Sequence, residues 1–236
     1  MPFTFSHPAI VLPLLKKYKL SATGLIIGSM SPDFEYFIRM KVQSNISHTL
    51  LGLILFNIPA GFLVALLVHE IIKKPLIENL PSFFQDRLVI LKNINWIDYL
   101  KFNFGYVIIS ILIGAFSHIF WDGFTHESGY LAEKIPFLQN EIMKIPFYKI
   151  LQHLSSLIGM IFILIYIYKL PHKNKQITRS IYKYWILVSI FILLFMLLRF
   201  SFGLKQIGNI IVSLISTTIL AITFTSLIFR NKKTTP

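Results

Sequence analysis

The chain has 236 residues, of which 55% are hydrophobic and only 14% are charged. A mean hydropathy of +0.67 excludes an ordinary soluble enzyme of this length, and 15% aromatic residues exclude intrinsic disorder. The net charge of +13 does not predict nucleic-acid binding, because the basic residues fall between apolar runs, where they meet lipid headgroups. The absence of Cys excludes disulfides and thiolate zinc sites, so a metal would need nitrogen and oxygen ligands.

Residues 1–48 form the first predicted element, a short N-terminal interfacial region. Its apolar run from Ala9 to Leu15 is too short to span a membrane and is followed by Lys16 and Lys17. A cleavable signal peptide places its positive charge before the apolar run, so we do not predict one here.

Five apolar stretches follow, each about 20 residues long, as a helix needs to cross a bilayer. They cover residues 50–72, 105–126, 151–170, 185–204 and 209–229. We therefore predict an all-α integral membrane helical bundle with about five transmembrane helices. Residues 1–160 are predicted to form a metal-binding membrane domain and residues 171–236 a two-helix membrane anchor.

The most informative polar residues are His118, Asp122 and His126, which lie in the second apolar stretch. A spacing of four residues places them on one helix face, with neighbours about 6 Å apart along the axis. His118 and Asp122 can therefore bind one cation. His126 would bind a neighbouring ion, or the chain would bend inward after Gly123 and bring His126 to the same ion. The alternative is that Asp122 reaches headgroup water and the histidines are satisfied by hydrogen bonds.

Alternating spans place further polar residues at the same membrane face. His48 starts the first span, the His118 motif ends the second and His153 starts the third, while His7 and Asp33 precede the first. Each has an ordinary alternative. His48 and His153 can be interfacial residues, and Asp33 can be a turn or N-cap residue.

Five segments together resemble a known family. They are 1–8, 28–37, 47–52, 117–126 and 151–156, and they contain the motifs MPFTFSHP, GSMSPDFEYF, SHTLLG, SHIFWDGFTH and LQHLSS. They resemble a bacterial family of multi-pass membrane proteins of unknown function, related to predicted membrane-bound metal-dependent hydrolases. A more distant similarity is to zinc-dependent phospholipases C. That similarity implies seven metal ligands: His7, Asp33, His48, His118, Asp122, His126 and His153.

The phospholipase pattern ends in H-x-x-x-E, whereas Leu157 stands four residues after His153. We therefore expect one or two divalent ions, of which zinc is the first choice, rather than three. The expected function is metal-dependent hydrolysis of a phosphoester or lipid-headgroup bond by a metal-activated water, with Asp33 or Glu35 as general base. A non-catalytic scaffold with a structural metal is the alternative, and a metal or ion transporter ranks below both.

The expected partners are membrane lipids and a lipid or phosphoester substrate. We expect the protein in the cell membrane. A small excess of Lys and Arg at the face opposite His118 predicts a cytoplasmic C-terminus and an outward-facing metal site.

Overall fold

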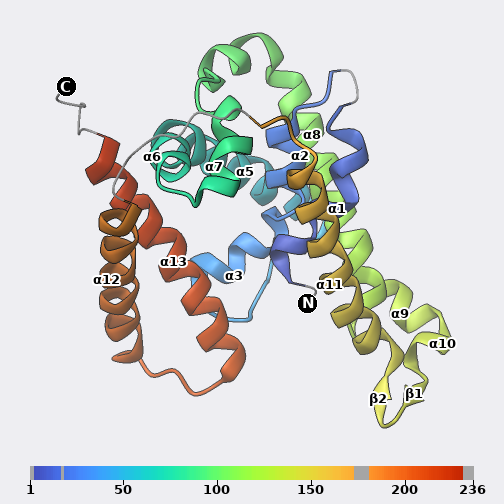
Figure 1. Cartoon of the computed structure of the whole chain (residues 1–236). Helices are drawn as coiled ribbons and strands as arrows, with labels where there is room; N and C mark the ends of the chain where they lie inside the picture. Colours follow the sequence, from blue (N-terminus) through green and yellow to red (C-terminus); the bar gives the residue numbers. More distant parts are fainter. Residues whose placement is uncertain (1–2, 17–18, 173–180, 231–236) are drawn as a thin grey trace, which may run out of the picture. The chain divides into compact units, whose positions relative to one another are not determined.

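The structure, a computed structural model, describes residues 3–16, 19–172 and 181–230. Helices dominate it (Figure 1), and the one sheet among these residues is an antiparallel hairpin of β1 (Glu141–Ile142) and β2 (Ile145–Pro146). The predicted all-α class is therefore confirmed. The predicted anchor domain includes residues 173–180 and 231–236, which lie outside the described residues.

Five helical stretches are long and apolar enough to cross a membrane, which confirms the predicted number of spans. They are Leu50–Glu78, Trp96–Lys134, Phe147–Tyr168, Ile181–Phe200 and Ile207–Arg230. The second begins earlier than hydropathy alone predicts because Asn95 caps the helix: its Oδ1 accepts a hydrogen bond from the Asp98 amide at 3.2 Å.

The chain forms two compact units. Unit 1 comprises Met1–Phe34, Asn45–Phe62 and Leu100–Tyr168, and unit 2 comprises Glu35–Ser44, Leu63–Tyr99 and Lys169–Pro236. Residues 63–99, which hydropathy alone groups with the N-terminal domain, thus cluster with the last two apolar helices. The helix α5 (Ile58–Leu67) continues from the first unit into the second.

Unit 1 begins with short helices and continues into two long ones. The short elements are η1 (Thr4–Ser6), α1 (Pro8–Val11), η2 (Leu12–Leu14), α2 (Ala22–Gly28), η3 (Ser31–Asp33), α4 (Leu50–Gly52), the π-helical turn η4 (Leu53–Asn57), α9 (Tyr130–Lys134) and α10 (Pro136–Gln139). The long helices are α8 (Trp96–Thr125), which bends at Asn103 and enters the unit at Leu100, and α11 (Phe147–Tyr168).

Helix α2 lies unusually close to α8 because glycine occupies the contact on both sides. A Cβ at Gly28 would lie 2.4 Å from the carbonyl oxygen of Ile111, and a Cβ at Gly114 would lie 2.5 Å from the backbone nitrogen of Ser29. Real Cβ atoms do not approach backbone so closely, so only glycine permits this spacing. The close contact brings the end of α2 against the middle of α8.

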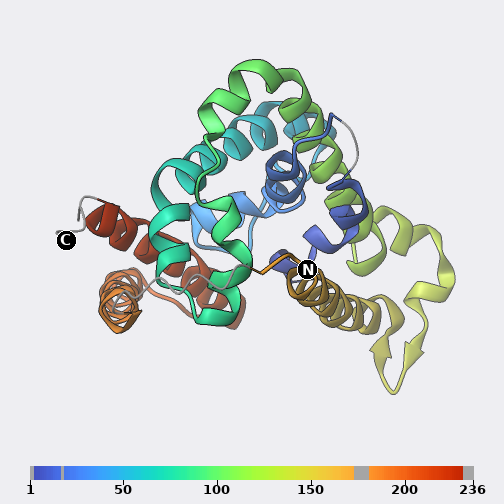
Figure 2. The ribbon, with the colours of Figure 1, turned by 45° about the horizontal axis from the view of Figure 1, so that its top comes forward.

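Helix α11 holds the N-terminal segment in unit 1, and both views show it beside α1 (Figure 1; Figure 2). The backbone N–H of Phe3 donates to Ser156 Oγ at 2.9 Å. The neighbouring Ser155 Oγ accepts from Trp121 Nε1 on α8 at 3.1 Å. These two serines therefore tie α11 to both the N-terminus and α8.

Unit 2 is built around a pair of long helices, α12 (Ile181–Phe200) and α13 (Ile207–Arg230), which lie side by side in both views (Figure 1; Figure 2). Tyr184, Val188 and Ala221 form their buried core, and the Tyr184 hydroxyl contacts Ser226 Oγ at 2.9 Å. The remaining elements are α3 (Phe34–Arg39), the π-helical turn η5 (Val68–Ile72), α6 (Lys73–Glu78), α7 (Ser82–Leu88) and η6 (Val89–Leu91).

Candidate metal centre

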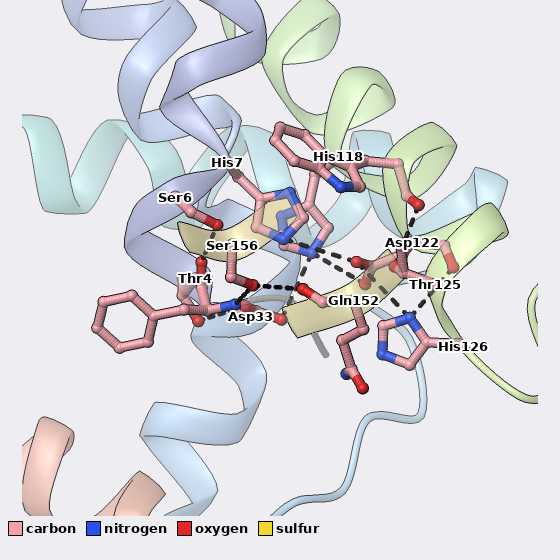
Figure 3. A network of polar contacts seen from close by, with 12 residues as sticks. Thr4, Ser6, His7, Asp33, His118, Asp122, Thr125, His126, Gln152 and Ser156 are labelled. Carbon is pink, nitrogen blue, oxygen red and sulfur yellow. Dashed lines mark hydrogen bonds and ion pairs between the residues drawn. The ribbon is translucent and has the colours of Figure 1, made fainter. Parts of the chain in front are cut away.

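Six of the seven predicted ligands come together in unit 1, carried by four separate segments. Figure 3 shows the cluster with His7, Asp33, His118, Asp122 and His126 labelled. His7 lies between η1 and α1, Asp33 ends η3, and His48 lies shortly before α4. His118 and Asp122 are on α8, and His126 follows its last residue. The close contact of α2 with α8 is what brings the segment of Asp33 beside His118.

Four donor atoms form the centre of this cluster, which we call the four-ligand group: Asp33 Oδ1, His48 Nε2, His118 Nε2 and Asp122 Oδ2. His118 Nε2 lies 3.5 Å from the Asp33 oxygen and 3.3 Å from the Asp122 oxygen. His48 Nε2 lies 3.6 Å and 3.7 Å from the same two atoms. Two ligands held at about 2.0–2.1 Å by a tetrahedral zinc ion are themselves about 3.3–3.4 Å apart. The four contacts are near this spacing, and Asp33, His48 and His118 together form a group whose ligand atoms could hold one cation.

The second carboxylate oxygen of Asp122 faces a different pair of histidines. Asp122 Oδ1 lies 3.6 Å from His7 Nε2 and 3.6 Å from His126 Nδ1. His7, His118 and Asp122 offer ligand atoms close enough together to hold an ion, as do Asp33, His48 and His118. The two groups share His118, and Asp122 belongs to the first of them.

Burial makes this arrangement costly without an ion. His7, Asp33 and His118 are fully buried and Asp122 nearly so. Among the described residues, both ring nitrogens of His7, Asp33 Oδ1, His118 Nε2 and Asp122 Oδ1 have no hydrogen-bond partner. A buried unsatisfied polar group costs about 1–3 kcal/mol. A divalent cation would give these lone pairs a partner, so the residues present fit one.

Hydrogen bonds to neighbouring groups fix which ring nitrogen of His118 and of His48 faces the other ligands. His118 Nδ1–H donates to the Ser29 carbonyl at 2.7 Å, so in the neutral ring the lone pair is on Nε2. Ser47 Oγ lies 3.1 Å from His48 Nδ1, again leaving Nε2 toward the cluster. Asn57, fully buried in η4, donates to the Ser47 carbonyl at 2.9 Å and fixes the backbone before His48.

Thr4 has the corresponding role for Asp33. Its hydroxyl donates to Asp33 Oδ2 at 2.5 Å, which leaves Oδ1 directed toward His48 and His118. We expect Thr4→Val to weaken metal binding about 10- to 100-fold, as loss of an outer hydrogen bond to a ligand typically does. Thr4→Ser, which retains the hydroxyl, should restore most of the affinity. Titration of each purified variant with zinc against a competing chelator measures this, and equal affinities for Val and Ser would contradict the assignment.

His126 differs from the other histidines in the nitrogen that faces Asp122, which is Nδ1 instead of Nε2. Its Nδ1–H donates to the Asp122 carbonyl at 3.1 Å, so the free lone pair of the neutral ring is on Nε2. The His126 side chain is 26% exposed and that of His48 is 24% exposed. These two rings are therefore the more exposed part of the cluster, whereas His7 is fully buried.

The electrostatics of His7 and Asp33, which lie outside the candidate spans, favour metal binding. Burial, assisted by the neighbouring His118, lowers the pKa of His7 to about 3, so its ring is neutral at pH 7. Burial acts to raise the pKa of Asp33, but His118 and the contacts from His118 and His48 outweigh it and hold that pKa below its usual value. Neutral imidazole and ionised carboxylate are the forms that bind metals.

His153 is not brought into the cluster: its side chain is exposed on α11. Neither candidate group includes it among the described residues. We expect His153→Ala to retain full metal content, whereas His118→Ala should lose most of it. Elemental analysis of both purified variants checks this prediction, and metal loss in His153→Ala would restore His153 as a ligand.

Glu35, the other candidate base, has its own partners in unit 2. Its carboxylate forms an ion pair with Arg39 at 2.9 Å and accepts a hydrogen bond from Ser44 at 3.0 Å. Asp33 in contrast belongs to the four-ligand group. Asp33 and Glu35, the two alternative general bases, thus have different surroundings.

Sequence reasoning did not single out the outer contacts. Thr4 stands three residues before His7, Ser47 directly before His48, and Ser155 and Ser156 two and three residues after His153. A hydroxyl residue close to a candidate ligand was the available signal for all of them. The Ser29 carbonyl has no such signal, because any residue supplies a backbone carbonyl.

Fold and cluster together define a class: an all-helical membrane protein with a buried His/Asp cluster that could hold a metal ion. The family described as "Domain of unknown function (DUF4184)" matches residues 1–228. The chain therefore belongs to this family, in agreement with the resemblance to a family of unknown function. Neither the curated proteins nor the solved structures compared with the chain gave a match.

Proposed function

We propose that the protein is a metal-dependent hydrolase of the cell membrane that cleaves a phosphoester or another polar lipid-headgroup bond. The observation that carries the proposal is the four-ligand group, in which four contacts between donor atoms measure 3.3–3.7 Å and three of them join different segments. The resemblance of the motifs to predicted membrane-bound hydrolases and to zinc-dependent phospholipases C points the same way. Zinc is the metal we propose, because imidazole and carboxylate at this spacing suit it.

A bound divalent cation supplies a water of lowered pKa and a positive charge that stabilises the developing oxyanion. The chain supplies the remaining requirements. Asp33, His48 and His118, with Asp122 beside them, would hold the ion, while Ser29, Ser47 and Thr4 orient them. In the hydrolysis, the water loses a proton as its oxygen bonds to phosphorus, the P–O ester bond breaks, and the leaving oxygen takes up a proton and departs as the alcohol.

Access favours catalysis over a purely structural ion. Structural zinc sites are closed by four protein ligands, whereas catalytic sites have three and keep the fourth position open. Asp33, His48 and His118 form a three-ligand group, which would leave the fourth position for water or substrate. The partly exposed rings of His48 and His126 lie on the accessible side of the cluster. A headgroup therefore reaches the site past these two rings, at the end of a candidate span, where headgroups lie.

Metal-dependent turnover of synthetic phosphoesters tests this function. We expect the purified protein to hydrolyse bis-p-nitrophenyl phosphate or phospholipid in mixed micelles, to stop after chelation, and to recover on adding zinc. His118→Ala should be inactive and His153→Ala active. A stoichiometrically loaded wild type without turnover on any of these substrates would instead favour the structural metal site.

The proposed orientation places the C-terminus in the cytoplasm and the metal site outside. Lys144 lies between β1 and β2, in the connection between the second and third spans. The chain has no Cys, so Lys144→Cys provides a single label site. We expect a membrane-impermeant thiol reagent to modify it in intact cells. Modification only after the cells are opened would contradict this orientation and place Lys144 on the cytoplasmic side.

A further inference from the structure

Unit 2 contains a cavity of about 690 Å³ that the metal centre does not use. Its walls come from η5, α6, the segment after η6, and the end of α13. This volume lies within the range of pockets that hold small-molecule ligands or lipid headgroups. The end of the first candidate span and the end of the last both contribute to it, and alternating spans place these two ends at the same membrane surface.

The charge of the cavity is positive. Lys73, Lys74, Lys92 and Arg230 line it, together with Glu70 and Glu78. Lys92 forms an ion pair with Glu78. Lys74 and Arg230 form no ion pair with any described residue. Four basic against two acidic residues leave an excess of positive charge, which favours an anionic occupant.

Lys73 adds a fixed, buried amine to this wall. The residue is only 9% exposed. Its ammonium group donates to the Ile94 carbonyl at 2.6 Å and contacts His69 Nδ1 at 3.2 Å. The His69 ring is in turn stacked on Trp96, with ring centroids 5.1 Å apart. An ammonium group has three N–H donors, so one remains after these two neutral acceptors are satisfied.

We propose that this cavity, which we call the Lys73 pocket, binds a phosphate-bearing anion. Lys and Arg donors are the usual partners of phosphate oxygens, and basic pockets between transmembrane helices bind anionic headgroups. The position at the end of two spans places the pocket at headgroup depth. The bound group is a phosphate with at least two anionic or protonated free oxygens, either as the monoester headgroup of a lipid or as inorganic phosphate. This inference does not depend on the proposed hydrolysis.

Lipid and phosphate binding to the full-length protein in detergent tests the Lys73 pocket. Native mass spectrometry with phosphatidic acid or phosphatidylcholine measures lipid binding, and equilibrium dialysis measures inorganic phosphate. The test variant is Lys74→Gln/Arg230→Gln, since both residues are exposed and their replacement spares the fold. Lys144→Gln/Lys149→Gln is the matched control, because it removes the same charge from exposed positions in unit 1.

We expect the wild type to bind phosphatidic acid in preference to phosphatidylcholine. In the test variant this affinity should fall about tenfold or more, as expected when hydrogen bonds to charged groups are lost, and it should not change in the control. Binding of inorganic phosphate with the same dependence on Lys74 and Arg230 would identify free phosphate as a ligand, and phosphatidic acid alone would identify a lipid. Absence of binding for both probes, or equal binding by the test variant, would overturn the proposal.

Discussion

Replacing Asp122 by asparagine should remove the bound metal. Asp122 is the residue that contacts His7, His48, His118 and His126, through both of its oxygens. Asparagine keeps the shape of the side chain but removes its negative charge and one of the two oxygens. Because loss of even an outer hydrogen bond typically costs about 10- to 100-fold, we expect metal affinity to fall by about 100-fold or more. A chelator competition with zinc measures the loss.

The matched control for Asp122→Asn is Glu133→Gln, an equivalent charge change at an exposed position of α9. It should bind metal as the wild type does. A second measurement separates metal loss from misfolding. Because a ligand that binds only the folded state stabilises it, chelation should lower the thermal unfolding temperature of the wild type and of Glu133→Gln but not of Asp122→Asn. Unchanged zinc affinity in Asp122→Asn would contradict the role we give this carboxylate.

The second large effect is expected at the contact between α2 and α8. In Gly114→Ala the new Cβ would lie 2.5 Å from both the Leu25 carbonyl oxygen and the Ser29 nitrogen, so the two helices must separate. Overpacking of this kind costs about 1–3 kcal/mol of unfolding free energy. The Ser29 carbonyl that orients His118 would move with α2, so metal affinity should fall as well.

Gly105→Ala in the same helix is the control, because no atom lies within 4 Å of its added Cβ. Alanine favours a helix over glycine by about 1 kcal/mol at either position, so the difference between the two variants isolates the helix contact. Thermal unfolding in detergent and zinc titration of both variants test this. Equal stability and equal zinc affinity would show that the two helices do not depend on glycine at their contact.

The sequence predicted the helical class and the five spans because a helix must contain about 20 apolar residues to cross a bilayer. It also predicted the shared face of His118, Asp122 and His126, since helical periodicity alone determines it. Counting of alternating spans then grouped His7, Asp33 and His48 with this motif. The structure brings these six residues together.

Tertiary contacts determine what the sequence did not reveal. Periodicity does not say that Gly28 and Gly114 face each other, nor that Ser29 offers its carbonyl to His118. The π-helical turn η4, which buries Asn57 against the Ser47 carbonyl, has no periodic signature. His153 was predicted as a ligand from its motif and its membrane face, but its side chain is exposed. The neighbouring Ser155 and Ser156 make the contacts with Trp121 and Phe3 instead.

The metal content of the wild-type protein tests the central claim most directly. The protein is purified in detergent without chelator, dialysed against trace zinc, manganese and iron, and submitted to elemental analysis. We predict one or two equivalents of a divalent metal per chain, with zinc preferred, retained through gel filtration. A folded protein that retains no metal under these conditions would contradict the account and leave the six clustered residues as a hydrogen-bonded and ion-paired core.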